Sequence, residues 1–178
     1  ILLGGRITHW KGQHLLLKAL AKMQNQNFYC IIAGDDQGRK DYLDYLKHLA
    51  DKLHLSSRVC FHGKVLDMPA LMSVSSVIVS AAIEPEAFGR ISVEGQAMGK
   101  IVVASDIGGS LDTITDGING KLFAANNSQD LANALDWALN LSDAQRKKIV
   151  DAGFENIKNN FTKEIMCDKT IAVYKELV

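Results

Sequence analysis

Short apolar stretches alternate with longer amphipathic stretches along most of the chain, and this alternation constrains the fold more than any other feature. Near-continuous apolar runs of three to six residues are typical of strands buried on both faces of a parallel sheet. Such runs occupy Ile1–Leu3, Phe28–Ala33, Arg58–Phe61, Val77–Ser80, Ile101–Ala104 and Lys121–Phe123. The sequence therefore predicts a parallel sheet of about six strands.

The segments between these runs carry apolar residues at helical spacing. Leu131, Leu135 and Leu139 recur every four residues, and similar stripes occupy 16–23 and 42–53. A stripe of this kind is the buried face of an amphipathic helix. Strands that alternate with helices predict a doubly wound, Rossmann-like α/β sheet with helices on both faces. We interpret residues 1–178 as one domain.

Local capping signals predict where three later helices begin. Asp67 and Pro69 indicate the start of a short helix, because Pro is tolerated in a first turn. Ser142 and Gln145 have the spacing of a capping box, and Thr162 is a suitable cap for a last helix. Two consecutive helices at the end predict a C-terminal helical tail. The last helix carries Ile165, Met166, Val173 and Leu177 among its apolar residues.

The charge balance and the apolar content exclude two classes of protein. Twenty Lys and Arg residues are matched by twenty Asp and Glu residues, so a broad nucleic-acid-binding surface is not expected. No stretch approaches the roughly twenty apolar residues that a membrane-spanning helix requires. A local basic pocket remains compatible with this composition.

The cysteines and histidines form no metal-binding pattern. Cys30, Cys60 and Cys167 are far apart in sequence, and the first two lie in strand-like runs, where we expect buried free thiols. This predicts a reducing compartment. We expect His62, at the end of a strand, to be a structural histidine. The other four histidines are expected at the surface: His9, His14, His48 and His54.

Two cations lie in the first loop that follows a strand. In an open parallel sheet, ligands bind outside the carboxyl ends of the strands, where this loop lies. Arg6 and Lys11 flank a glycine-containing turn before a helix. A planar guanidinium, a point charge and a helix N-terminus together suit a diphosphate. Surface cations on an incidental turn are the alternative at this point.

A second loop, residues 80–94, follows a buried strand and leads into another helix. The N–H groups of Gly89–Ile91 would be the unpaired donors at that helix start, which is an anion-binding arrangement. Glu86 precedes the helix and Glu94 lies within it. Carboxylates accept hydrogen bonds from sugar hydroxyls, although they also favour helix N-termini without any ligand.

These motifs together form an ordered set. The set comprises Gly5-Arg6 with Lys11-Gly12, then Glu86 and Glu94 with Phe88-Gly89, then Val102–Ser105 with Gly108-Gly109. The sequence resembles the C-terminal, donor-binding domain of retaining GT-B glycosyltransferases of the glycogen-synthase and lipopolysaccharide-type group (glycosyl transferases group 1). The resemblance covers nearly all of the chain, including Gly34-Asp35, the turn at 116–120 and the helical tail.

The resemblance implies roles for individual residues. Arg6 and Lys11 would hold the donor diphosphate, and Glu86 would contact hydroxyls of the transferred sugar; these three are the expected catalytic residues. Glu94 would contact the nucleotide ribose. The remaining substrate-binding residues implied are Gly5, Gly34, Val65, Phe88, Gly89, Arg90 and Ile91, with Gly34 and Val65 beside the base. No metal or cofactor is implied, and the substrate would be a UDP-, GDP- or ADP-sugar.

The resemblance also implies an activity and a setting. A GT-B enzyme of this group transfers sugar with retention, here in cell-envelope polysaccharide or lipopolysaccharide synthesis. The acceptor, a sugar, glycan or lipid-linked molecule, would bind an N-terminal domain that we expect to lie outside this chain. The chain would then be half of a GT-B fold and inactive alone. The expected location is cytoplasmic, either free or in peripheral contact with the inner face of the membrane.

Several residues depart from the family pattern, and other functions remain open. Asp112, Gly95 and Lys100 replace residues more usual in the group and are interpreted as packing changes. Trp10 is expected to be a surface aromatic, or else a contact to the other domain. The alternative functions are a nucleotide-sugar epimerase, a phosphorylase, a non-catalytic sugar-nucleotide sensor and a dinucleotide-binding domain. The last would require G-x-G-x-x-G after the first strand, which 4–9 does not supply.

Overall fold

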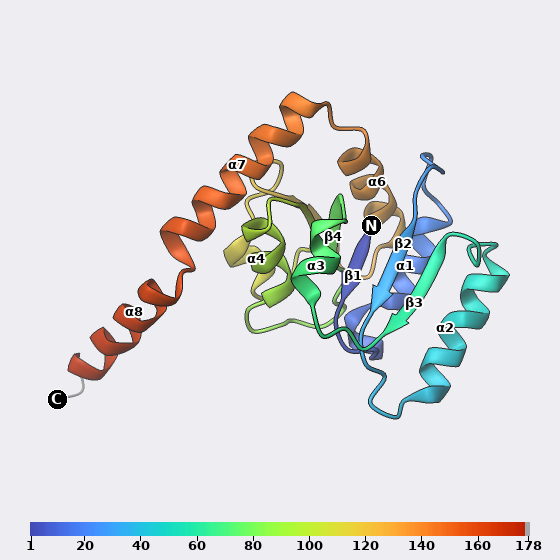
Figure 1. The fold of residues 1–178 in the computed structure, drawn as a ribbon, viewed down its shortest axis with the longest axis horizontal. Coiled ribbons are helices and arrows are strands. Elements are labelled where there is room, and N and C mark those ends of the chain that lie inside the picture. The colour runs from blue at the N-terminus through green and yellow to red at the C-terminus, as the bar shows by residue number, and fades with distance from the viewer. Residues whose placement is uncertain (177–178) are drawn as a thin grey trace.

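Six parallel strands form the centre of the molecule, in the order β3-β2-β1-β4-β5-β6 (Figure 1). The structure, a computed structural model, describes residues 1–176. The sheet winds outward from β1 in both directions, which is the doubly wound topology. The predicted six-stranded parallel sheet is therefore confirmed. The strands are β1 (Leu2–Gly4), β2 (Cys30–Ala33), β3 (Val59–Gly63), β4 (Val77–Ser80), β5 (Ile101–Ser105) and β6 (Lys121–Phe123).

Helices cover both faces of this sheet, as predicted. Successive strand side chains point to opposite faces, so Leu3 belongs to one apolar cluster and Leu2 to another. The larger cluster packs against α1 (Gln13–Leu20), α2 (Lys40–Lys52) and α6 (Ser128–Leu139). The smaller packs against α3 (Met68–Ser73) and the start of α4 (Arg90–Ala97). Gly95 packs tightly there, because a β-carbon would stand 3.0 Å from Val102.

The three predicted helix starts are confirmed by hydrogen bonds. The Asp67 carboxylate accepts from the Ala70 N–H at 2.9 Å at the start of α3. Ser142 and Gln145 form both bonds of a capping box ahead of α7 (Asp143–Asn160). Thr162 accepts from the N–H of Ile165 at 3.3 Å, beside the start of α8 (Lys163–Glu176). Leu177 lies outside the described residues.

The helical tail, α7 and α8, extends away from the sheet. Figure 1 shows α7 and α8 running away from the core toward the C-terminus, α7 packing along α4 and α8 beyond it. The described part of α8 has no buried residue. None of the helices in residues 1–176 combines the length and the apolar character that crossing a membrane requires.

Two burial predictions are wrong. Cys60 is exposed, whereas Cys30 is 1% exposed and its burial raises the pKa of the thiol to about 12. The reason is strand order, because β3 is an edge strand and β2 is interior. His14 is half-buried, with Nδ1 3.1 Å from the Tyr42 hydroxyl, because α1 packs against α2 at this point. His9, His48 and His54 are exposed, as predicted.

Candidate functional site

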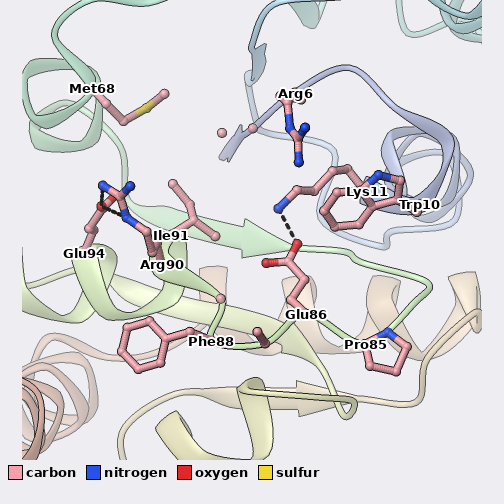
Figure 2. Close-up of a pocket in the computed structure, with 14 residues that line it drawn as sticks. Arg6, Trp10, Lys11, Met68, Pro85, Glu86, Phe88, Arg90, Ile91 and Glu94 are labelled. Atoms are coloured by element: carbon pink, nitrogen blue, oxygen red, sulfur yellow. Dashed lines mark hydrogen bonds and ion pairs between the residues drawn. The ribbon is translucent and has the colours of Figure 1, made fainter. Parts of the chain in front are cut away.

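A cavity of about 620 Å³ opens at the carboxyl ends of β1 and β4. These two strands are neighbours at the point where the strand order of the sheet reverses. This is the usual ligand position in such folds. Figure 2 shows Arg6, Lys11 and Glu86 turned toward one another in this space. Nine of the predicted site residues line it: Gly5, Arg6, Lys11, Glu86, Phe88, Gly89, Arg90, Ile91 and Glu94.

The backbones of the two site loops touch each other. The Ile83 N–H donates to the Trp10 carbonyl oxygen at 2.8 Å. Gly12 has a φ of +71°, and a β-carbon there would stand 1.8 Å from the Ala81 carbonyl oxygen. Only glycine fits such a contact in a left-handed conformation. The glycine after Lys11 therefore brings the cationic loop against the start of the acidic one.

This arrangement pairs Lys11 with Glu86. The Lys11 ammonium and one oxygen of the Glu86 carboxylate form an ion pair across the cavity (Figure 2). Their side chains are 18% and 14% exposed. Lys11 Nζ also lies 4.5 Å from the centroid of the Trp10 ring, and Arg6 Cζ lies 5.7 Å from it. Two cations are thus held at the cavity by an aromatic face and a carboxylate.

A pair of glycines from another loop supports Glu86 from behind. The Gly109 N–H donates to the Glu86 carbonyl oxygen at 2.8 Å. A β-carbon on Gly108 would stand 2.5 Å from that same oxygen, and one on Gly109 would stand 2.6 Å from Phe88 Cα. The Gly108-Gly109 motif of the predicted set therefore acts on the site through the backbone of residues 86–88.

The N-terminus of α4 faces the cavity. Its N-cap, Gly89, has a φ of +72° and provides no side-chain cap, so the first N–H groups of the helix are not satisfied by a capping side chain. Such a helix start attracts anions. One turn on, Glu94 accepts from Arg90 at 2.9 Å on the exposed rim. The cavity thus has a cationic wall, an anion-attracting helix start and two carboxylates.

Two predicted residues lie elsewhere. Gly34 lines a second cavity of about 250 Å³ together with Asp35 and His62. Gly34 also packs against the cationic loop, since a β-carbon would stand 1.7 Å from the Gly5 carbonyl oxygen. Val65 is half-buried against the smaller apolar cluster and lines neither cavity. His62 is exposed at the second cavity and is not packed as a structural histidine, so that interpretation is wrong.

Some residues of the cavity lining are not among those predicted from the sequence. Trp10, predicted to be a surface aromatic or else a contact to the other domain, is half-buried and lines the main cavity beside Lys11. Met68 forms part of the opposite wall of the cavity. No sequence motif points to Met68, because it belongs to a separate short helix. Within residues 1–176, no group of three or more His, Cys, Asp or Glu side chains is placed to hold a metal ion.

Comparison with known proteins identifies a family for this chain. The family model for "Glycosyl transferases group 1" matches residues 1–156. The D-inositol 3-phosphate glycosyltransferase of Mycobacterium tuberculosis H37Rv is 30% identical over 177 residues, which cover 98% of this chain and 36% of that protein.

Two solved structures are similar throughout. A glycosyltransferase from Rickettsia africae superposes with a TM-score of 0.94 at 38% identity, covering 98% of this chain and 46% of that one. The Anabaena protein Alr3699/HepE, in complex with UDP-glucose, superposes with a TM-score of 0.88 at 32% identity, covering 99% and 49%. The chain thus spans about half the length of these solved structures and about a third of the curated relative. By its family match and by its fold, the chain belongs to the glycosyl transferases group 1 family.

Proposed function

We propose that this chain is the donor-binding domain of a glycosyltransferase that takes a sugar from a nucleotide-activated donor. The observation that carries the proposal is the Lys11–Glu86 pair, which joins a cationic loop to an acidic loop inside one cavity at a helix N-terminus. Family membership supports it, as does the UDP-glucose bound by the Anabaena relative.

The donor would lie along the cavity with its diphosphate at the cations. Arg6 offers a planar fork and Lys11 a point charge, and the N–H groups at the start of α4 face the same space. Glu86 would accept hydrogen bonds from the transferred sugar, with Gly5, Phe88 and the 89–91 amides around it. Glu94, on the rim, would meet the ribose. We place the base toward the ends of β2 and β3, beside Gly34 and Val65.

Stabilisation of negative charge would lower the barrier of the reaction. As the bond to the sugar breaks, negative charge grows on the departing nucleoside diphosphate, and Arg6 and Lys11 stabilise that charge. One preorganised donor of this kind commonly lowers a barrier by roughly 3 kcal/mol. In the ligand-free protein Lys11 is held by Glu86. Donor binding would give Lys11 a phosphate partner and leave Glu86 to the sugar. These side-chain cations supply positive charge without a metal ion.

The acceptor site belongs to a larger protein in this proposal. The cavity has room for a donor and opens at the sheet edge. The chain covers less than half the length of each of the three relatives named above. We propose that an N-terminal domain binds a sugar, glycan or lipid-linked acceptor, in cell-envelope polysaccharide or lipopolysaccharide synthesis in the cytoplasm or at its membrane face. Transfer would retain the anomeric configuration.

Calorimetric titration of the chain with UDP, GDP, ADP and NAD tests this proposal. We expect one nucleoside diphosphate to bind, with affinity unchanged by EDTA and reduced at least tenfold in Lys11→Ala, since loss of about 1.4 kcal/mol is a tenfold change. Tight binding of NAD without binding of any nucleoside diphosphate would show a dinucleotide-binding domain instead.

A further inference from the structure

Three side-chain oxygens surround one point beside Gly89, a residue that lines the main cavity. A β-carbon built on Gly89 would have Glu86 Oε2, Ser92 Oγ and Ser110 Oγ as its nearest neighbours outside the adjacent residues, each at 4.0 Å. A β-carbon would thus make only ordinary contacts at this point, which polar atoms approach from three sides. Gly89 lacks a side chain and leaves this point free.

Ser92 is the unusual member of this group. It is 0% exposed, and its hydroxyl has no hydrogen-bond partner among the described residues. A buried hydroxyl without a partner is unfavourable, and an alanine would fill the same position in α4 without that cost. A serine at this place therefore indicates a partner supplied from outside the protein chain.

The other two oxygens are held in place by the site itself. Lys11 binds Glu86 Oε1, and Figure 2 shows the second carboxylate oxygen turned away from Lys11. Ser110 is 5% exposed at the start of α5 (Ser110–Thr113), directly after the two glycines that support the Glu86 backbone. The two serines can donate and the carboxylate can accept. This set matches a single O–H group, which accepts from the serines and donates to Glu86.

We propose that Ser92 and Ser110 are positioning residues that, with Glu86 Oε2, bind one O–H group beside Gly89 and thereby hold the Glu86 carboxylate toward the donor sugar. The inference rests on the proposed function, in which Glu86 contacts that sugar. The O–H group comes either from the sugar itself or from a water molecule that lies between the sugar and the three oxygens. Both sources share the same hydrogen-bond pattern.

Calorimetry tests this role by measuring the affinities of the chain for UDP-glucose and for UDP. Ser92→Ala and Ser110→Ala should each weaken UDP-glucose about three- to tenfold and leave UDP unchanged, as expected for one lost hydrogen bond. In a Glu86→Ala background, Ser92→Ala should have a smaller effect on UDP-glucose affinity, because the shared O–H group has then lost its acceptor. Ser75→Ala is the matched control: Ser75 is buried, its hydroxyl donates to Leu71 at 2.9 Å, and it lies outside this cavity.

The melting temperature of the ligand-free chain identifies the source of the O–H group. If the sugar supplies it, Ser92→Ala melts at or above the wild-type temperature, whereas Ser75→Ala melts lower. If a resident water supplies it, both variants melt lower, yet only Ser92→Ala loses UDP-glucose affinity. Equal UDP-glucose affinity in Ser92→Ala and wild type overturns the inference, as does a loss of undiminished size in the Glu86→Ala background. A wild-type chain that binds no nucleotide sugar contradicts the proposed function instead.

Discussion

The Lys11 ammonium is held by the Glu86 carboxylate, a residue 75 positions away in the chain. Both side chains are largely shielded from water, at 18% and 14% exposed, yet they line an open cavity. Each group thus already has a partner of opposite charge before a ligand arrives. In the proposed function, the donor would offer Lys11 a phosphate and Glu86 the hydroxyl groups of a sugar.

Lys11→Ala should abolish turnover of the complete enzyme far more than it destabilises the fold. We expect kcat to fall about 100- to 1000-fold, the usual effect of removing one donor that stabilises developing charge. The free energy of unfolding should fall by only about 1 kcal/mol, because water reaches Glu86 through the cavity. Steady-state kinetics and urea unfolding measure the two effects. Lys18→Ala, on an exposed part of α1, is the control; kinetics equal to that control would refute the role of Lys11.

Gly12→Ala should unfold the domain, whereas Gly117→Ala should not. Both glycines have a φ of +71°, so alanine costs roughly 1–2 kcal/mol at either position. A β-carbon on Gly117 meets nothing within 4 Å, but one on Gly12 would stand 1.8 Å from the Ala81 carbonyl oxygen. Urea unfolding measures the loss of stability in each variant. Because both variants share the backbone strain, the difference between the two losses comes from the contact between the site loops. Equal losses of stability would show that these loops do not need their close approach.

Trp10 should report donor binding by its fluorescence. Its ring lies 4.5 Å from Lys11 Nζ, so a diphosphate that draws Lys11 away changes the surroundings of the indole. We expect UDP to alter the emission of the wild type and of Trp137→Phe, but not of Trp10→Phe. Trp10→Ala should also weaken UDP about two- to fivefold, from a lost cation–π contact of about 0.5–1 kcal/mol. A UDP response that depends on Trp137 would contradict this placement.

Stability should fall as the pH drops from 6.5 to 4, and His14 should account for part of that loss. Burial lowers the pKa of His14 to about 4 from 6.5, with smaller contributions from the charges of His9 and Lys18. In this window the unfolded chain binds a proton at His14 and the folded chain does not, so acid favours unfolding. Thermal melts across the window should show a shallower decline for His14→Gln than for wild type.

His48→Gln, at an exposed position on α2, is the control for that measurement. It should follow the wild-type curve. A His14→Gln curve parallel to both would mean that the imidazole is protonated equally in the folded and unfolded chains.

Local features of the fold could be predicted from the sequence, because they depend on residues that are close together in the chain. The strands lie within about two residues of the predicted ranges, and the bonds at Asp67, Ser142 and Thr162 link residues only three positions apart. Exposure of Cys60 could not be read in this way. Its apolar run resembles that of Cys30, and only the edge position of β3 makes the two thiols differ.

By itself, the sequence determined that strands and helices alternate, and it placed the cations and carboxylates in loops at one edge of a parallel sheet. Short-range hydrogen bonds and side-chain periodicity determine those features. Only the tertiary structure decided that Lys11 meets Glu86, that Trp10 faces the cavity, and that Ser92 is buried beside Gly89 with no hydrogen-bond partner within residues 1–176. Those relationships depend on β1 lying next to β4, a long-range pairing that buries apolar surface and that no local pattern encodes.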